Sequence, residues 1–172
     1  MKTLYLLRHA KAAPAEMGQD DHARPLAGRG RRDADRMGEL LEQRGEPLDF
    51  VLCSSSRRTR ETLERVLDRL KARPRVLIES DLYLADCESL LERVRSLPDD
   101  ADRAMLIGHN PGLADLADAL VIRGSKEARQ RLARKFPTGA LAIVQFDVAR
   151  WDEAQPGAEL VAFLVPRELE PA

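Results

Sequence analysis

The chain has 172 residues, with 28 Lys or Arg against 29 Asp or Glu, so its formal net charge is -1. This balance excludes a nucleic-acid binder that relies on overall positive charge, and 44% hydrophobic residues exclude a disordered chain. No apolar run reaches the roughly 18 residues of a membrane span, and the N-terminus does not read as a signal peptide. We therefore expect one domain over residues 1–172, in the cytoplasm, without nucleic-acid or membrane partners.

Short apolar runs alternate with amphipathic segments along the chain. The continuously apolar runs that open the pattern are typical of parallel strands buried on both faces. Strands are expected at residues 3–7, 50–53, 76–78, 104–107, 140–146 and 160–165, and helices at 30–43, 58–69, 88–97 and 112–122. This order predicts an α/β fold, a three-layer α/β/α sandwich with a mostly parallel central sheet. The last two strands should form an antiparallel hairpin.

Residues 10–27 lack any periodicity and contain Pro14, Gly18 and Pro25, so they are expected to form a long loop. Loops of this length within a small domain are often functional.

Chemically useful side chains gather where the expected strands end. Arg8 and His9 follow the first expected strand, and His109 follows the fourth. Two of the three histidines in the chain therefore lie directly after strands. The second strand runs through three serines into the helix that contains Arg58. Because the carboxyl ends of parallel strands meet at one edge of a sheet, these groups are expected to converge there.

Each of these features also has a purely structural explanation. Arg8 and His9 could begin a solvated loop, residues 108–112 could form only a turn, and the serines could only cap a helix. The arginines near residue 58 could form a solvated helix face. These explanations account for each feature separately but not for the convergence of two histidines and two arginines on one edge.

The converging set suits a phosphoryl group. The guanidinium groups of Arg8 and Arg58 match phosphate oxygens bidentately, and a helix N-terminus can add backbone N–H groups. A neutral imidazole can attack phosphorus when one ring nitrogen is held as N–H and the other is free. These considerations do not decide which of His9 and His109 is the nucleophile.

The sequence resembles a known family at these positions. Leu-Arg-His-Ala-Lys at 7–11, Ser-Ser-Ser-Arg-Arg-Thr-Arg-Glu-Thr at 54–62 and Gly-His at 108–109 resemble the signatures of the histidine phosphatase superfamily, which has the phosphoglycerate-mutase-like fold. Arg-Pro-Leu at 24–26, Gly30, Leu-Tyr at 82–83 and residues 107–113 resemble the SixA-like phosphohistidine phosphatases more narrowly. Ser55 departs from a frequent proline, and Thr59 and Glu61 depart from the commoner Ala and Gln.

The resemblance implies roles for individual residues. His9 would be the nucleophile that accepts the phosphoryl group, Arg8 and Arg58 would bind that group, and His109 would donate to one of its oxygens. Arg24 is placed near the pocket, and Lys11 would extend its positive rim.

The expected function is a phosphatase that removes phosphate from phosphohistidine on proteins, such as a histidine phosphotransfer domain, without metal or other cofactor. A small-metabolite phosphomonoesterase, or a weakly active module that binds phosphorylated partners, are the alternatives. The resemblance implies that no dedicated carboxylic acid is present, which favours cleavage of P–N over P–O bonds because imidazole leaves readily.

His22 is expected to be solvated, Cys53 to lie in the core and Asp86 to cap a helix, while Trp151 is a candidate for an interaction surface.

Overall fold

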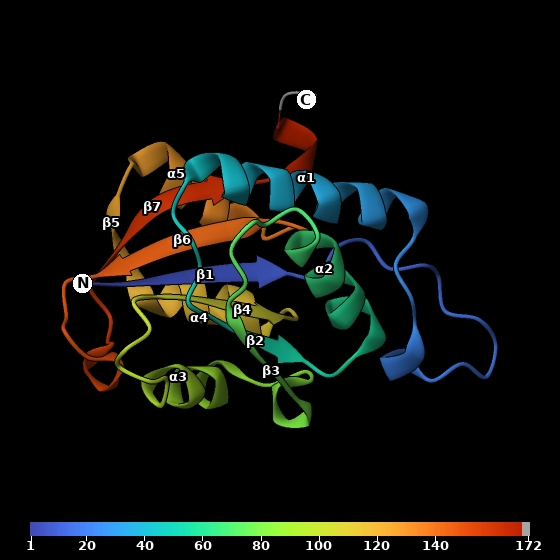
Figure 1. Ribbon diagram of the computed structural model, residues 1–172, viewed down its shortest axis with the longest axis horizontal. Coiled ribbons are helices and arrows are strands. Elements are labelled where there is room, and N and C mark those ends of the chain that lie inside the picture. Colours follow the sequence, from blue (N-terminus) through green and yellow to red (C-terminus); the bar gives the residue numbers. More distant parts are fainter. Residues whose placement is uncertain (170–172) are drawn as a thin grey trace.

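A mixed seven-stranded sheet forms the middle layer of the computed structural model, which describes residues 1–169 (Figure 1). The strands are β1 (Lys2–Arg8), β2 (Phe50–Ser54), β3 (Arg75–Glu79), β4 (Arg103–Gly108), β5 (Val121–Gly124), β6 (Leu141–Phe146) and β7 (Ala158–Leu164). The α-helices are α1 (Gly28–Arg44), α2 (Arg57–Leu67), α3 (Cys87–Arg95), α4 (Gly112–Leu120) and α5 (Lys126–Arg134).

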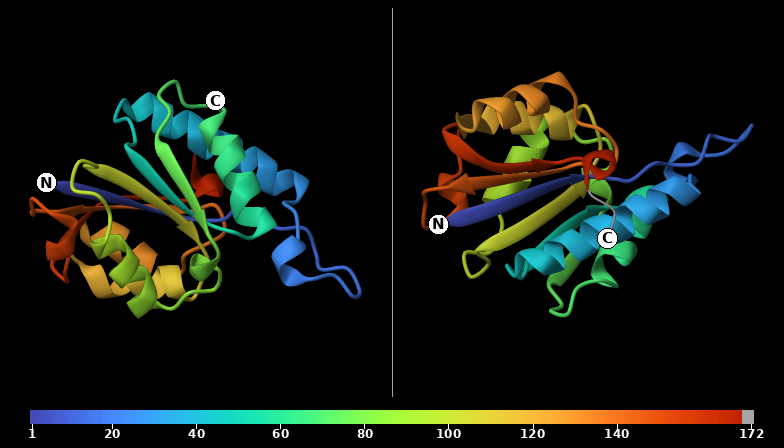
Figure 2. Two further views of the ribbon diagram at one scale, coloured as in Figure 1. Left: turned by 60° about the horizontal axis from the view of Figure 1, so that its bottom comes forward. Right: turned by 90° about the horizontal axis from the view of Figure 1, so that it is seen from above.

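The strand order is β3-β2-β4-β1-β6-β7-β5, and β6 runs antiparallel to both of its neighbours while the other pairings are parallel. The prediction of an α/β fold with a mostly parallel sheet is confirmed, as is the antiparallel pairing of the last two strands. Helices cover both faces of the sheet (Figure 2).

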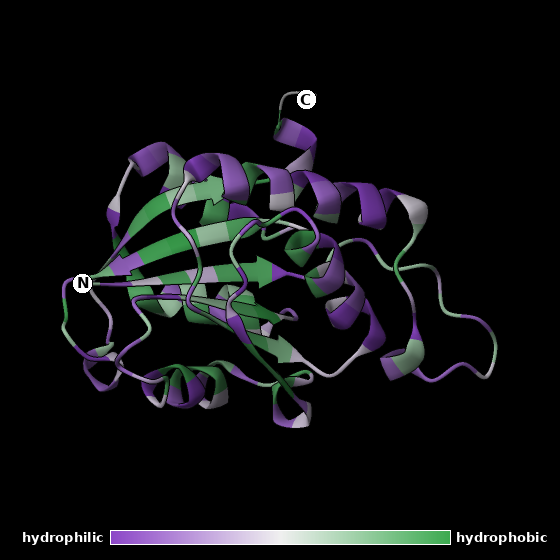
Figure 3. Ribbon diagram, viewed as in Figure 1, coloured by the Kyte–Doolittle hydropathy of each residue, from purple (hydrophilic) through white to green (hydrophobic). Residues whose placement is uncertain are grey.

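Successive side chains of the central strands point to opposite faces of the sheet, so the hydrophobic core consists of two main clusters. Leu4 and Leu6 of β1 pack into the cluster that contains residues of α3, α4 and α5, while Tyr5 and Leu7 pack into the cluster with α1 and α2. The strands are accordingly apolar along their length, whereas the helices carry polar outer faces (Figure 3).

The sheet edges differ from the prediction. The sequence predicts a strand at 76–78 that is buried on both faces, but β3 is an edge strand and Leu77 and Ile78 are about half exposed. The helix expected at 112–122 ends at Leu120, because the following four residues pair with β7 as β5. Sequence analysis also missed α5, a strongly charged helix that buries only Leu132.

Trp151 lies in the core, so the interpretation of this residue as an interaction surface is wrong. Its side chain is fully buried, and its indole N–H donates to the carbonyl of Ala101 at 2.7 Å. The buried ammonium of Lys2 donates to the carbonyl of Asp99 at 2.6 Å and to the carboxylate of Asp102 at 2.9 Å. These contacts tie both the loop after β6 and the amino end of β1 to the same segment, residues 99–102, before β4.

Within residues 1–169, no helix is long and apolar enough to cross a membrane.

Candidate active site

The pairing of β1 with β4 brings the two strand-end histidines together. The strands are parallel, and Arg8 lies opposite Gly108 in their register. His9 and His109 therefore leave adjacent strands at the same height, and their ring centroids are 5.4 Å apart. β2 pairs with the other side of β4, so the start of α2 lies beside the same two strand ends.

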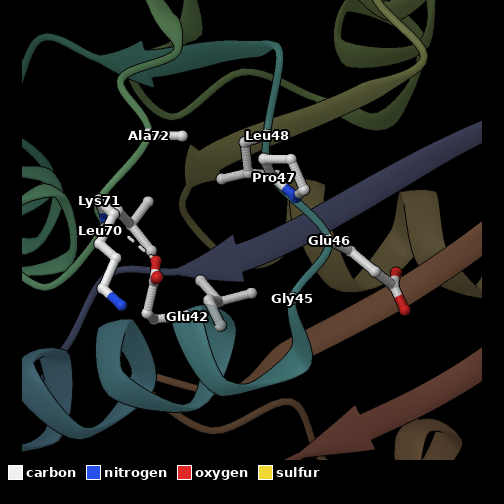
Figure 4. A pocket seen from close by; sticks show the side chains of 9 residues that line it. Glu42, Gly45, Glu46, Pro47, Leu48, Leu70, Lys71 and Ala72 are labelled. Carbon is white, nitrogen blue, oxygen red and sulfur yellow. Dashed lines mark hydrogen bonds between the residues drawn. The ribbon is translucent and has the colours of Figure 1, made fainter.

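The six residues singled out in the sequence line one pocket of about 260 Å³ at this edge of the sheet: Arg8, His9, Lys11, Arg24, Arg58 and His109. Asn110 and Thr138, which sequence analysis did not single out, also line it. A separate hollow of about 200 Å³ lies at the amino ends of β2 and β3, between Leu48 and Leu70, and contains no histidine (Figure 4). Of these two, the pocket with the histidines lies at the carboxyl edge that open α/β sheets use for ligands.

His9 is held as a neutral imidazole with one nitrogen free. Its Nδ1 lies 2.8 Å from the carbonyl of Ala10, which can only accept, so Nδ1 carries the proton and Nε2 is left with its lone pair. The residue is 6% exposed, and burial, aided by nearby arginines, lowers the pKa of His9 from 6.5 to about 4. At neutral pH its Nε2 is therefore unprotonated and keeps its lone pair.

His109 is engaged at both nitrogens. Nη2 of Arg58 donates to its Nδ1 at 3.3 Å, so the neutral ring carries its proton on Nε2 and donates to Oγ of Ser54 at 2.7 Å. Burial, together with His9 and Arg58, lowers the pKa of His109 to about 3. The Ser54 hydroxyl is fully buried and can either accept from this ring or donate to it.

Arg8 and Arg58 each have an N–H group without a hydrogen-bond partner. Nη1 of Arg58 donates to the carbonyl of Asp21 at 2.8 Å, and Nη1 of Arg8 donates to the carbonyl of Phe136 at 3.0 Å. The Nε groups of both Arg8 and Arg58 are buried and have no hydrogen-bond partner in the structure. Unpaired buried N–H groups are costly, and two of the three such Nε groups in the described residues belong to arginines that line this pocket, the third being that of Arg44 at the end of α1.

Sequence analysis assigned no role to Asp21 or Tyr83, which contact Arg58 and His109. The carboxylate of Asp21 accepts from Arg58 at 3.1 Å, from Arg24 at 3.0 Å and from the Tyr83 hydroxyl. The hydrogen bond from Tyr83 is the main cause of the lowered pKa of Asp21. The Tyr83 ring meets His109 edge-on, with centroids 5.3 Å apart. The signals in the sequence were the long aperiodic loop that contains Asp21 and the Leu-Tyr pair at 82–83 that resembles the SixA-like phosphatases.

His22 also departs from expectation, because it is partly buried rather than solvated. Its Nε2 bonds Oγ of Ser55 at 2.8 Å, and its ring packs against Tyr83 with centroids 4.9 Å apart. Cys53 is buried in the core as expected, and Asp86 caps α3 by accepting from the N–H of Ser89 at 2.8 Å. Within residues 1–169, no group of three or more His, Cys, Asp or Glu side chains could hold a metal ion.

The pocket geometry and the two histidines at adjacent strand ends agree with comparisons of sequence. Residues 4–110 match the model of the histidine phosphatase superfamily (branch 1). The chain belongs to the histidine phosphatase superfamily. An uncharacterized protein of Mycobacterium tuberculosis is 36% identical to it over 164 residues, which cover 94% of this chain and all of that relative.

Solved structures of other members have the same fold. A Nakamurella multipartitia protein assigned to SixA, a phosphohistidine phosphatase, is similar with a TM-score of 0.84 and 32% identity over 96% of both chains. An Agrobacterium tumefaciens protein with the same assignment has a TM-score of 0.80 and 27% identity, over 96% of this chain and 98% of its own. The fold of this histidine phosphatase superfamily member is therefore the phosphoglycerate-mutase-like fold that the sequence indicated.

Proposed function

We propose that this chain is a phosphohistidine phosphatase that works through a phosphorylated His9. The observation that carries the proposal is the free Nε2 of a neutral His9 beside two guanidinium groups whose Nε–H groups lack partners. A nucleophile with a fixed tautomer and a preorganised set of donors for the transferred group is the arrangement that covalent phosphoryl transfer needs.

In the first step, Nε2 of His9 attacks phosphorus in line with the leaving group. The new N–P bond forms as the substrate P–N bond breaks, and the leaving imidazole keeps the electron pair and takes a proton from solvent. Arg8 and Arg58 hold the phosphoryl oxygens with their fork of donors. In the second step, water attacks the phosphohistidine, and phosphate leaves while Nε2 of His9 recovers its lone pair.

His109 would donate to the phosphoryl group through Nδ1, the nitrogen that Arg58 approaches in the ligand-free structure. The donation requires the other tautomer, and Ser54 permits the change because its hydroxyl can turn to donate to Nε2. Arg58 is released from His109 at the same moment and becomes available to the phosphoryl oxygens.

The surroundings of the pocket support P–N over P–O cleavage. Alkoxide leaving groups need a proton donor, whereas imidazole, with a pKa of about 6.5, leaves without one. No carboxylic acid is among the residues that line the pocket within the described chain. Asp21, above the site, is kept ionised by its donors, Glu79 pairs with Arg93 at 2.7 Å, and Asp86 caps α3.

The proposal is tested by trapping the intermediate. The protein is mixed briefly with a radiolabelled phosphohistidine protein, and the labelled chain is treated with acid or base. We expect a label that is lost in acid, survives in base, disappears in His9→Ala and persists in His22→Ala. A label that survives acid would exclude phosphohistidine.

Relative rates then separate this function from its alternatives. We expect phosphoramidate to be hydrolysed faster than an alkyl phosphate, with little change in Asp81→Asn or Asp86→Asn. Efficient hydrolysis of the alkyl phosphate that depends on either carboxylate would favour a metabolite phosphomonoesterase. Tight binding of a phosphoprotein without label or turnover would favour a binding module.

A further inference from the structure

An exposed leucine stands at the mouth of the pocket in an unusual backbone conformation. Leu84 is 56% exposed, borders the same pocket as His9, and belongs to none of the buried clusters of the described chain. Its φ of +52° lies in the left-handed region, and it is the one residue other than glycine with a positive φ among the described residues. Leucine disfavours this conformation because its Cβ crowds the backbone.

The conformation belongs to a tight turn over residues 82–85. Tyr83 has φ -65° and ψ 116°, Leu84 follows with positive φ, and the N–H of Ala85 donates to the carbonyl of Leu82 at 3.3 Å. These are the features of a type II turn, whose third position normally holds Gly or Asn. The chain has a leucine where either of those residues would be relaxed.

The turn is fixed on both sides, so Leu84 is presented rigidly. Leu82 is buried in the core, and the Tyr83 hydroxyl donates to Asp21 in the loop before α1. The Ala85 carbonyl packs so closely on Gly112 that a Cβ at position 112 would lie 2.0 Å from it. Burial does not explain this strained turn, because the Leu84 side chain that it presents points away from the core. Backbone strain of this kind is concentrated at functional sites.

The volume of the pocket limits which part of a substrate Leu84 can contact. A volume of about 260 Å³ is below the roughly 300–1,000 Å³ of pockets that enclose whole small molecules. The reacting histidines lie at its base, 6% and 4% exposed, so a phosphoryl group and its imidazole would fill it. Whatever carries that imidazole must lie outside, against the mouth where Leu84 is exposed beside the cations Lys11 and Arg24.

We infer that Leu84 determines specificity for a folded protein substrate, by packing against apolar surface beside the phosphorylated histidine. The inference rests on the proposed function and deepens it, since it assigns the substrate to proteins rather than to free phosphoramidates. Contact of this kind contributes to binding of the protein substrate and not to the chemistry at His9.

The test compares substrates of three sizes in three variants. Phosphoramidate, free phosphohistidine and a phosphorylated histidine phosphotransfer domain are assayed with wild type, Leu84→Asn and Leu84→Met. Leu84→Asn should lose at least about tenfold in kcat/KM on the phosphorylated domain, mainly through KM, and less than about twofold on the two small substrates. Leu84→Met should keep the wild-type kcat/KM on the domain. Ile122→Thr, at a site of matched exposure on β5, should change none of the three.

Stability separates a contact from a merely structural role. Because Asn tolerates positive φ, the melting temperature of Leu84→Asn should equal or exceed that of wild type. A lower melting temperature with equal losses on all three substrates, or an unchanged rate on the phosphorylated domain, would overturn the inference alone. A wild-type protein that hydrolyses alkyl phosphates but none of the three P–N substrates would overturn the proposed function, and this inference with it.

Discussion

Asp21 accepts two hydrogen bonds from the guanidinium group of Arg58: its carboxylate Oδ2 lies 3.1 Å from Nη2, and its main-chain carbonyl accepts from Nη1 at 2.8 Å. A negative charge of the protein thus lies where a substrate anion would be attracted. Asp21→Asn removes the charge but keeps the backbone contact that positions Arg58.

We therefore expect Asp21→Asn to bind inorganic phosphate more tightly, lowering its inhibition constant roughly three- to fivefold, the size of one partly exposed charge interaction. Competitive inhibition assays at low and high salt would measure the change, which should shrink at high salt. Asp20→Asn, whose side chain caps the turn at His22, is the control and should behave like wild type. Weaker phosphate binding in Asp21→Asn would show that the carboxylate positions Arg58 instead.

The buried histidines should make stability depend on pH. The pKa of His9 is lowered to about 4 and that of His109 to about 3, whereas unfolded histidine titrates near 6.5. Between these values the unfolded chain binds more protons, so the free energy of unfolding falls as pH drops below about 6.5. Each unit of difference in pKa corresponds to about 1.4 kcal/mol.

Urea unfolding at pH 7 and pH 5 measures this effect. Wild type should lose stability over this interval, and a variant with His9→Gln and His109→Gln should lose less. Ring-proton titrations by NMR should show no midpoint above pH 5.5 for either histidine. A midpoint near 6.5 for His9 would contradict its description as a desolvated, neutral nucleophile.

Ser54→Ala removes the Nε2 partner of a buried His109. We expect kcat to fall about tenfold with a smaller change in KM, because the hydroxyl orients a ring needed during transfer. Nitrogen NMR of His109 should report an altered tautomer population. Ser56→Ala is the matched control: Ser56 caps α2 through the N–H of Thr59, so it should cost about 1 kcal/mol of stability and leave kcat within about twofold.

Two glycines of α1, Gly28 and Gly30, differ in whether the fold leaves space for a Cβ atom. A Cβ at Gly30 would lie 2.1 Å from the carbonyl of Lys11, whereas a Cβ at Gly28 would meet only the ends of arginine side chains at 3.5 Å. Gly30→Ala should therefore destabilise the fold by about 1–3 kcal/mol and disturb the chain beside His9. Gly28→Ala should be neutral or slightly stabilising. Thermal unfolding and phosphatase assays of both variants check this, and equal effects would refute the packing argument.

The edge of the sheet that holds the candidate site could be located from sequence because it follows from strand direction. His9, His109 and Arg58 lie close to strands whose apolar character is strong, and parallel strands place their carboxyl ends together. Asp21 and Tyr83 could not be found in this way, because they lie 62 residues apart on loops without periodicity and meet only through tertiary structure.

The errors at the sheet edges and in the hairpin loop have related causes. β5 is four residues long and owes its strand conformation to pairing with β7, which a local pattern does not reveal. The α5 helix buries one leucine, too little for an amphipathic signal. Trp151 follows a polar loop segment, yet the carbonyl of Ala101, 50 residues away, gives its indole a buried partner.

The register of β1 with β4 also separates what can change in this protein from what cannot. The spacing of the two histidines is dictated by a ladder of main-chain hydrogen bonds in the middle of the sheet, where a slip of one residue would reverse every side chain. Lys11, Arg24 and Leu84, which lie at the mouth of the pocket, belong to the loop before α1 and the turn before α3. Both segments lie outside the hydrogen-bonded pairing of β1 with β4. If the proposed function holds, we therefore expect substitutions in those two segments to change which phosphorylated surface is bound while the two histidines keep their positions.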